Sequence, residues 1–244
     1  MTDLHTHILP GMDDGPKALS SALALVERQL LQGAGRIALT SHYHCEAESP
    51  ESFLNRREAA FSALMAHCPR EVRLKRGCEV FFSPQLLGME LDTLCLEGTR
   101  LLLLELPVLQ KPAFLREVLL YLRQRGITPL IAHAERYRYV AQDPRLLADW
   151  MELGALIQVN AQSVIDGGLA LRLIRWGLCQ VIASDAHSLP HRPPNLRQAL
   201  GIVSKKLGPE KAGRLEQNAA ALFSGFEPVP GEVRIPRRVL GFWL

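Results

Sequence analysis

The chain has 244 residues, 48% of them hydrophobic, and a formal net charge of +3. So small a charge argues against an extended nucleic-acid-binding surface, which needs a concentrated basic patch. No apolar run reaches the roughly 20 residues of a membrane span. The five cysteines are odd in number and lack CxxC spacing, which is typical of reduced thiols. Because no basic-then-apolar leader is present, we expect a soluble cytoplasmic protein with no nucleic-acid partner and no membrane span.

Apolar runs of strand length alternate with amphipathic helical stretches along the chain. We expect strands at residues 3–8, 36–40, 72–80, 100–106, 129–132, 156–159 and 180–183. We expect helices at residues 17–31, 50–68, 113–125, 144–153, 163–176, 195–207 and 209–223, with a short helical turn at 83–88. Ser49 and Pro50 suit the N-cap and first turn of one helix.

Seven strand-then-helix units in a row, with continuously apolar strands, indicate an α/β fold in which helices cover a parallel sheet. The length suits an α/β barrel formed as one domain. No change of composition marks a boundary before Gly225, so we expect one domain over residues 1–225. The tail at 226–244 differs, with three prolines, three arginines and a terminal Gly-Phe-Trp-Leu. It is either an arm, packed on the barrel or loose, or a docking segment for a partner.

Histidine, carboxylate and amide side chains stand at the end of each expected strand. In chain order these are His5 and His7, His42 with His44, Glu79, Glu105, His133, Gln158 and Asn160, and Asp185 with His187. In a strand, residues i and i+2 face the same side, so the first two imidazoles point in one direction. Since the carboxyl ends of barrel strands surround one mouth, we expect all these side chains to converge on one site.

The expected ligands combine imidazole and carboxylate, a set that favours Mn²⁺, Fe²⁺, Zn²⁺ or Co²⁺. They number five histidines and four carboxylates: His5, His7, His42, His133, His187, Asp14, Glu79, Glu105 and Asp185. This exceeds what one cation can hold, so we expect two or three metal ions, with Glu79 as a bridge. Clustered metal ions lower the pKa of a shared water and hold attacking and leaving oxygens. The expected reaction is hydrolysis, and phosphate esters are the usual substrates of such clusters.

Two arginines follow ligand-bearing strands, Arg136 after His133 and Arg192 after His187. Cations repel a guanidinium, so metal binding does not explain it, whereas an anionic substrate such as phosphate does. The alternative role of each arginine is an ion pair that orients a ligand carboxylate.

Several motifs occur in order over residues 1–224. They are His5-Thr-His7-Ile-Leu-Pro-Gly-Met-Asp-Asp14-Gly-Pro-Lys, Thr-Ser-His42, Gly-Cys-Glu79-Val, Ile-Ala-His133-Ala-Glu-Arg136-Tyr, Gln158-Val-Asn160 and Ala-Ser-Asp185-Ala-His187-Ser-Leu-Pro-His-Arg192-Pro-Pro. This combination resembles the CpsB/CapC-type manganese-dependent protein tyrosine phosphatases of the polymerase-and-histidinol-phosphatase (PHP) superfamily. The resemblance implies a distorted, TIM-like (β/α)7 barrel of the PHP type with a trinuclear manganese site.

The resemblance also implies a role for each ligand. The first metal would be held by His5, His7, Glu79 and Asp185, the second by Glu79, Glu105 and His133, and the third by Asp14, His42 and His187. Asp13, next to Asp14, is the alternative carboxylate. Members of the family dephosphorylate the tyrosine-rich tails of bacterial autokinases that control capsule or exopolysaccharide synthesis. A phosphotyrosine protein, such as a kinase of polysaccharide synthesis, is therefore the implied partner.

Our hypothesis for the reaction is that a metal-bridging hydroxide attacks phosphotyrosine phosphorus in line. Arg136 and Arg192 would stabilise the phosphoryl oxygens, and His42, His187 or a metal-bound water would assist the leaving group. Asp185 is essential as a metal ligand. A cysteine nucleophile is excluded, because no cysteine has an arginine six positions later. His44 and His191 are either solvent-facing or help to protonate the leaving group.

Three alternatives stay open at this point. Another phosphoesterase of the same superfamily, such as a histidinol-phosphate phosphatase or a nuclease, would use a similar ligand set. An amidohydrolase is disfavoured because none of the six lysines stands at a strand end, where such enzymes often place a modified lysine as a bridge. A non-enzymatic, metal-loaded protein that only binds kinase tails is disfavoured by the complete ligand set.

Overall fold

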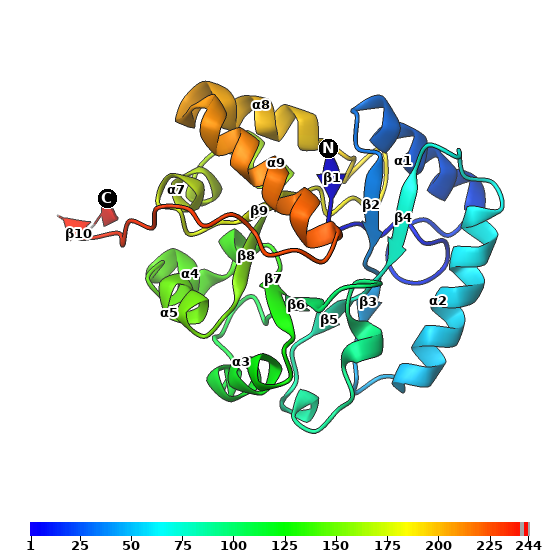
Figure 1. Ribbon diagram of the computed structural model, residues 1–244, viewed down its shortest axis with the longest axis horizontal. Helices are drawn as coiled ribbons and strands as arrows, with labels where there is room; N and C mark the ends of the chain where they lie inside the picture. Colours follow the sequence, from blue (N-terminus) through cyan, green and yellow to red (C-terminus); the bar gives the residue numbers. More distant parts are fainter. Residues whose placement is uncertain (240–241, 244) are drawn as a thin grey trace.

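Short parallel strands form the centre of the computed structural model, which describes residues 1–239 and 242–243, and helices surround them (Figure 1). The strands are β1 (Thr2–Asp3), β2 (Arg36–Leu39), β3 (His42–Tyr43), β4 (Arg73–Arg76), β5 (Glu79–Phe81), β6 (Leu101–Glu105), β7 (Thr128–Ile131), β8 (Leu156–Asn160), β9 (Val181–Ala183), β10 (Arg238–Val239) and β11 (Phe242–Trp243). The α-helices are α1 (Leu19–Leu31), α2 (Pro50–Met65), α3 (Leu115–Gln124), α4 (Arg138–Gln142), α5 (Leu146–Glu152), α6 (Ala161–Asp166), α7 (Leu169–Arg175), α8 (Leu196–Leu207) and α9 (Pro209–Phe223). Three short 3₁₀ helices are η1 (Pro84–Leu86), η2 (Asp92–Leu94) and η3 (Ala134–Arg136).

The strands of the body form two parallel sheets, in the orders β1-β2-β4 and β3-β5-β6-β7-β8-β9. The parallel α/β arrangement expected from the apolar runs is therefore confirmed. The closed barrel is not found among the described residues. Where the sheets meet, backbone hydrogen bonds join residues beyond the ends of β9 and β1: Asp185 N donates to His5 O and His7 N to Ala186 O, each at 2.9 Å.

Two strand paths break in the middle and change sheet at the break. The strand expected over residues 72–80 is divided into β4 and β5 at Gly77–Cys78, and β2 is likewise followed by β3. At this point the Glu79 N–H lies between two acceptors, Thr40 O at 3.1 Å and Ser41 O at 3.0 Å. Such a shift in a ladder re-aims the following side chain, as β-bulges do. Here it precedes Glu79, which points into the interior.

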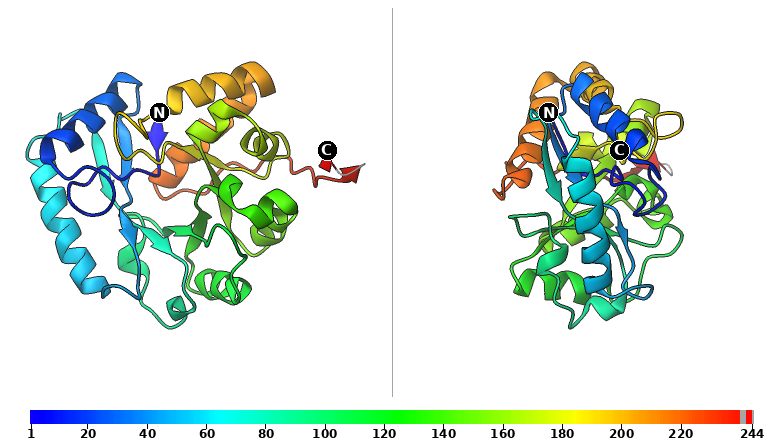
Figure 2. Two further views of the ribbon diagram at one scale, coloured as in Figure 1. Left: turned by 180° about the vertical axis from the view of Figure 1, so that it is seen from behind. Right: turned by 90° about the vertical axis from the view of Figure 1, so that its right-hand side faces the viewer.

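An apolar cluster fills the interior near the start of the strands. It contains Leu101 and Leu103 of β6, Leu130 of β7 and, from α9, Leu222 and Phe223. α9 lies across β1 and β9 and covers this end of the strands (Figure 1). Helices α1 and α2 cover the outer side of the three-stranded sheet, and the right-hand view of Figure 2 faces this side. The interior is thus closed and apolar at one end.

Several helices differ from the sequence expectations for local reasons. The helix expected over 163–176 is two helices, α6 and α7, because Gly167 and Gly168 adopt φ angles of 93° and 67° that an α-helix does not allow. α4 was not expected at all. The N-cap at Ser49 is confirmed, since its side chain accepts a hydrogen bond from Ser52 N at 3.2 Å.

The tail beyond α9 lies against the body of the fold as an arm. Val229 N donates to Asn218 Oδ1 at 2.8 Å, and Arg234 N donates to Trp176 O at 2.7 Å. Gly177 permits this approach, because a Cβ there would lie 2.1 Å from Glu232 O. In the part of the chain that the structure describes, no helix is both long and apolar enough to cross a membrane.

Candidate metal centre

The side-chain alternation of the strands delivers polar groups to one end of the fold. In β6, Leu101 and Leu103 face the apolar cluster, and Glu105 follows on the same face. After β9, Asp185 continues the series of Val181 and Ala183 in the same way. Because the strands are parallel, these continuations meet at the carboxyl end of the sheet. In these two strands the apolar interior therefore changes to a polar site.

The first group of candidate ligands is His5, His7, Glu79 and Asp185. The His5 and His7 Nε2 atoms are 3.0 Å apart, and each lies 3.2 Å from Glu79 Oε2. Asp185 Oδ1 is 3.4 Å from His5 Nε2 and 3.5 Å from His7 Nε2. All four side chains are nearly fully buried. The ligand atoms of His5, His7 and Asp185 thus lie together, and Glu79 Oε2 lies beside the two histidines.

Glu79 connects this group to a second one. Its Oε1 lies 3.0 Å from His133 Nε2, which is in turn 3.5 Å from Glu105 Oε1. His42 Nδ1 lies 3.1 Å from Glu79 Oε2 and 3.7 Å from Glu105 Oε2. Glu79 therefore offers one oxygen to each of two neighbouring points, as a bridging carboxylate does.

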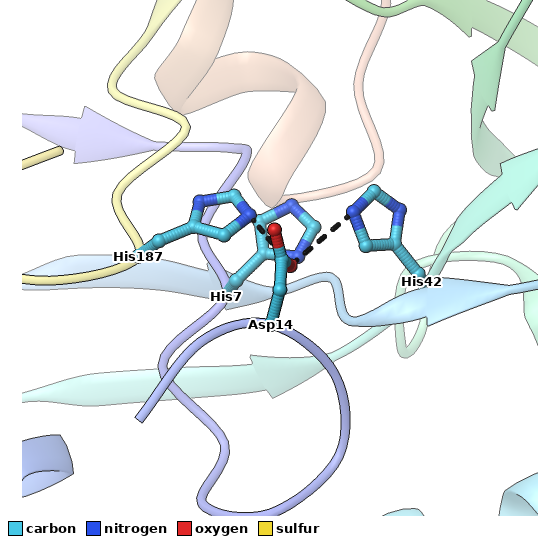
Figure 3. Close-up of side chains that lie close together, drawn as sticks. All are labelled: His7, Asp14, His42 and His187. Atoms are coloured by element: carbon cyan, nitrogen blue, oxygen red, sulfur yellow. Dashed lines mark ion pairs between the residues drawn. The ribbon is translucent and has the colours of Figure 1, made fainter. Parts of the chain in front are cut away.

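A third group comprises Asp14, His42 and His187, next to His7 (Figure 3). Asp14 Oδ1 lies 3.0 Å from His187 Nε2 and 3.6 Å from His42 Nε2. His42 thus turns one ring nitrogen to Asp14 and the other to Glu79. All nine side chains expected as ligands from the sequence lie in this one continuous cluster.

Spacing and donor chemistry fit divalent cations. Two ligand atoms about 2.0–2.2 Å from a shared cation lie roughly 3.0–3.5 Å apart, the range observed around Glu79. Glu79 Oε2 and His42 Nδ1 are buried without a hydrogen-bond partner. An unpaired buried polar atom is unfavourable, and a cation bound to Glu79 Oε2 would satisfy that oxygen. The cluster is therefore suited to hold metal ions.

The charges within the cluster are tightly coupled. Burial disfavours the charged form of His7, but the carboxylates of Asp13 and Glu79 outweigh this effect and raise the pKa of His7 to about 10. Despite burial, His5 and His7 hold the pKa of Asp185 below its usual range. Burial and the nearby Glu79 carboxylate raise the pKa of Glu105. Since a cation must displace the imidazole protons, metal binding will strengthen as the pH rises.

Two candidate ligands have strained backbones. His133 has φ 31° and Asp185 has φ 54°, a region that residues other than glycine rarely adopt. Such strain persists only where the surroundings impose it, and it is concentrated at functional sites. The Asp185 backbone is held by its hydrogen bond to His5 O, so the strain helps to place its carboxylate beside the two histidines.

Asp13 has a supporting role that the sequence expectations missed. Its Oδ2 lies 2.7 Å from His7 Nδ1 and accepts a hydrogen bond from His42 N at 3.0 Å. A carboxylate on the far nitrogen of a ligand histidine fixes the tautomer and orientation of the ring. The two adjacent aspartates therefore differ in position. Asp14 lies beside His187 in the cluster, whereas Asp13 lies behind the cluster and contacts His7 and His42. The sequence shows two aspartates after the HxH motif, but the pattern does not tell which one is a candidate ligand and which one supports a ligand histidine.

A second supporting chain contains Gln158 and Asn160. Gln158 Oε1 lies 3.2 Å from His5 Nδ1 and accepts from His133 N at 2.7 Å. Its amide donates to Asn160 Oδ1 at 2.8 Å, and Asn160 Nδ2 donates to Asp185 Oδ2 at 2.7 Å. The two amide residues expected at the end of this strand thus hold three candidate ligands in place.

The two arginines stand at the edge of the cluster. Arg192 Nη2 pairs with Asp185 Oδ2, and its Nη1 lies 3.0 Å from His187 Nε2. Arg136 Nη1 lies 3.8 Å from the same Asp185 oxygen. Their side chains are 45% (Arg136) and 39% (Arg192) exposed, so both can meet a ligand from solvent as well as orient the carboxylate.

Two further histidines were left without a fixed role by the sequence. His44 is exposed, and its ring stacks on Phe81 with centroids 5.0 Å apart and lies 6.0 Å from His42. His191 is exposed and lines a cavity together with Arg136 and Arg192. Neither lies among the grouped ligand atoms.

The chain has clear relatives. The family model "Capsular polysaccharide synthesis, CpsB/CapC" matches residues 1–224. The tyrosine-protein phosphatase YwqE of Bacillus subtilis (strain 168) is 29% identical over 261 residues, covering 100% of both chains. The tyrosine-protein phosphatase CpsB of Streptococcus pneumoniae is 29% identical, over 88% of this chain and 94% of its own.

A similar fold has been solved. A chain from "Crystal structures of YwqE from Bacillus subtilis and CpsB from Streptococcus pneumoniae, unique metal-dependent tyrosine phosphatases" has a TM-score of 0.88 and 26% identity. The match covers 98% of this chain and 100% of the solved one. Sequence motifs, fold and relatives agree, and this chain belongs to the CpsB/CapC family of capsular polysaccharide synthesis.

Proposed function

We propose that this chain is a metal-dependent phosphatase that removes phosphate from phosphotyrosine in proteins. The observation that carries the proposal is the cluster of nine imidazole and carboxylate side chains with two arginines at its edge. The cluster supplies ligands for cations, and the two arginines supply groups that bind an anion. The names of the relatives, tyrosine-protein phosphatases, support the same activity.

We propose three groups of metal ligands and Mn²⁺ as the ion, with two or three ions bound. His5, His7, Glu79 and Asp185 would hold the first, and Glu79, Glu105 and His133 the second. Asp14, His42 and His187 would hold the third, His42 through Nε2. The short donor–donor distances around Glu79 support the first two groups, and the 3.0 Å separation of Asp14 Oδ1 from His187 Nε2 supports the last.

Each part of the site has a distinct task in the proposed reaction. When bound, clustered divalent cations provide a water of lowered pKa and neutralise charge on phosphoryl oxygens. Arg136 and Arg192 hold the phosphate through charge-assisted hydrogen bonds. His42 and His187 would assist the departing phenolate. The Asp185 carboxylate contacts both arginines and both N-terminal histidines, and so orients them relative to one another.

We further propose the finer architecture. β2 with β3 and β4 with β5 are single paths, so the nine body strands trace seven paths, which we interpret as the distorted barrel of the PHP type. We assign residues 1–225 to the phosphatase domain and 226–244 to a tail. The contacts of Asp185 and Ala186 with His5 and His7, where the two sheets meet, support this arrangement.

The natural substrate we propose is a bacterial tyrosine kinase of polysaccharide synthesis in the cytoplasm. The family description, capsular polysaccharide synthesis, supports this choice. Phosphotyrosine is carried by a flexible peptide, which can reach the partly exposed Arg136 and Arg192.

A substrate panel tests the proposed activity. The Mn²⁺-loaded protein should hydrolyse a phosphotyrosine peptide with a higher kcat/KM than histidinol phosphate, and it should leave single-stranded DNA intact. Higher kcat/KM for histidinol phosphate, or cleavage of DNA, would replace the proposal with another phosphoesterase activity. Binding of the phosphotyrosine peptide without any turnover would replace it with a non-enzymatic role.

A further inference from the structure

Two cavities of similar size flank the candidate metal centre and differ in chemistry. One, of about 380 Å³, is lined by polar groups, among them Arg136, Asp185 and Arg192. The other, of about 370 Å³, is lined mainly by apolar side chains, Leu25 and Leu189 among them. The first is accounted for by phosphate recognition. The second has no role in phosphate recognition or in the proposed reaction.

The apolar cavity is built from three segments. α1 contributes Ala24 and Leu25, the loop after the two aspartates contributes Pro16, and the loop after β9 contributes Leu189 and Pro190. Leu25 is fixed in the core with 1% of its surface exposed, whereas Leu189 is 43% exposed. Leu189 therefore presents apolar surface to the cavity.

The cavity is continuous with the metal centre, because Asp14 and His187 line both. These two side chains lie together, with Asp14 Oδ1 3.0 Å from His187 Nε2 (Figure 3). A molecule whose phosphate reaches the cluster can therefore place its other end among Leu25, Leu189 and Pro190. Ligand pockets of this kind combine an apolar wall with a few fixed polar groups.

We infer that this cavity seats the phenyl ring of phosphotyrosine. The inference rests on the proposed phosphatase function and adds the basis of its selectivity. A phenyl ring is flat and apolar, and it separates the phosphate from the peptide by several ångströms. Phosphoserine has no ring to fill the cavity and keeps its peptide next to the phosphate, so it would gain nothing from the apolar wall.

A second place for a ring is less suitable. His44 and Phe81 also lie near His42, but they already stack on each other with centroids 5.0 Å apart. Each ring thus covers one face of the other. The apolar cavity, in contrast, is concave and shares two candidate ligands with the centre.

Substitution of Leu189 tests the inference. With Mn²⁺ bound, Leu189→Ser should raise KM for a phosphotyrosine peptide about tenfold and leave kcat within about twofold, since the lost contact is to the ring. Turnover of the matching phosphoserine peptide should not change. Ala24→Leu, which fills the cavity from α1, should have the same selective effect. Leu31→Ser is the matched control, because Leu31 is 70% exposed at the far end of α1.

Binding of phosphonates gives a readout that does not depend on turnover. By calorimetry, the Mn²⁺-loaded wild type should bind phenylphosphonate more tightly than methylphosphonate, and Leu189→Ser should weaken only the former, about tenfold. Equal weakening of both phosphonates, or no change in either, would overturn the inference. So would a selective loss in His44→Ala instead. If the wild type binds both phosphonates but hydrolyses no phosphotyrosine, the proposed function fails, and the ring assignment fails with it.

Discussion

The two ends of the central strands differ in almost every physical property. At the carboxyl end, histidines and carboxylates are buried side by side, and His133 and Asp185 have strained backbones. At the amino end, Leu101, Leu103 and Leu130 pack against α9 in an apolar cluster. β6 takes part in both, since Leu101, Leu103 and Glu105 share one face. One strand thus contributes packing at one end and candidate ligands at the other.

The apolar cluster at the amino end stabilises the fold, whereas the groups at the carboxyl end form the candidate metal centre. Burying apolar surface is the main favourable term in folding. Burying charged groups without ions is unfavourable unless they are paired. Substitutions at the two ends should therefore have different effects, one on metal binding and turnover and the other on stability, and five variants make the comparison quantitative.

The largest effect is expected at the bridging carboxylate. Glu79→Gln removes the charge that joins two candidate metal positions, so kcat for a phosphotyrosine peptide should fall at least ~1,000-fold. Elemental analysis should find fewer bound Mn²⁺ ions, while circular dichroism should show a folded protein. Wild-type metal content with near wild-type turnover would remove Glu79 from the centre.

At the opposite end, Leu103→Ala should act on stability alone. Leu103 is 4% exposed within the apolar cluster, and its truncation should lower the free energy of unfolding by about 2–5 kcal/mol. Urea denaturation measures this loss. Because the change lies two residues before Glu105 on the same strand, kcat of the still-folded variant tests whether the two ends are independent. A hundredfold loss of kcat would show that they are not.

The adjacent Asp13 and Asp14 provide a finer comparison within the candidate metal centre. Asp13→Asn removes the carboxylate behind His7 and should weaken Mn²⁺ binding about 10–100-fold, while the full number of ions still binds at saturating metal. Asp14→Asn removes a candidate ligand and should lower that number even at saturation. Metal titration followed by elemental analysis separates the two outcomes, and identical behaviour of both variants would contradict the assignment.

The smallest effect is expected from the ion pairs that Arg76, the last residue of β4, forms with Glu58 and Glu97. Arg76 Nη2 lies 2.6 Å from Glu97 Oε1, and this hydrogen bond lowers the pKa of Glu97. Arg76→Ala should lower the free energy of unfolding by only ~0.2–1 kcal/mol at neutral pH. Since the folded-state pKa is depressed, the contribution is present above the ordinary glutamate pKa and is lost as the pH falls below it. Denaturation curves of variant and wild type should converge in acid and differ most at neutral pH.

The sequence predicts the composition of the site better than the shapes of the elements that carry it. Parallel strands bring their carboxyl ends to one edge, so a polar side chain at each strand end was enough to predict that the cluster forms. Strand limits were less predictable. Residues 4–8 do not continue β1 as a regular strand, because isolated backbone bonds replace the ladder there: Thr40 N donates to Thr6 O, and His7 N donates to Ala186 O, far away in the chain.

Other differences depend on tertiary contacts or on a single local feature. The break between β4 and β5 arises where the Glu79 N–H lies between two carbonyls of the neighbouring path, which no local pattern reveals. The roles of Asp13 and Asp14 depend on where His7 and His42 meet in space. Gly167 and Gly168, in contrast, were a readable signal for the end of α6, and the apolar pattern around them concealed it.

The most direct test of the central claim is removal and return of the metal. After exhaustive chelation, verified by elemental analysis, turnover of a phosphotyrosine peptide should fall at least ~1,000-fold. Added Mn²⁺ should restore it in proportion to the two or three ions bound per chain. Undiminished phosphatase activity in protein shown to contain no metal would contradict the proposal that the mouth of this fold is a metal centre.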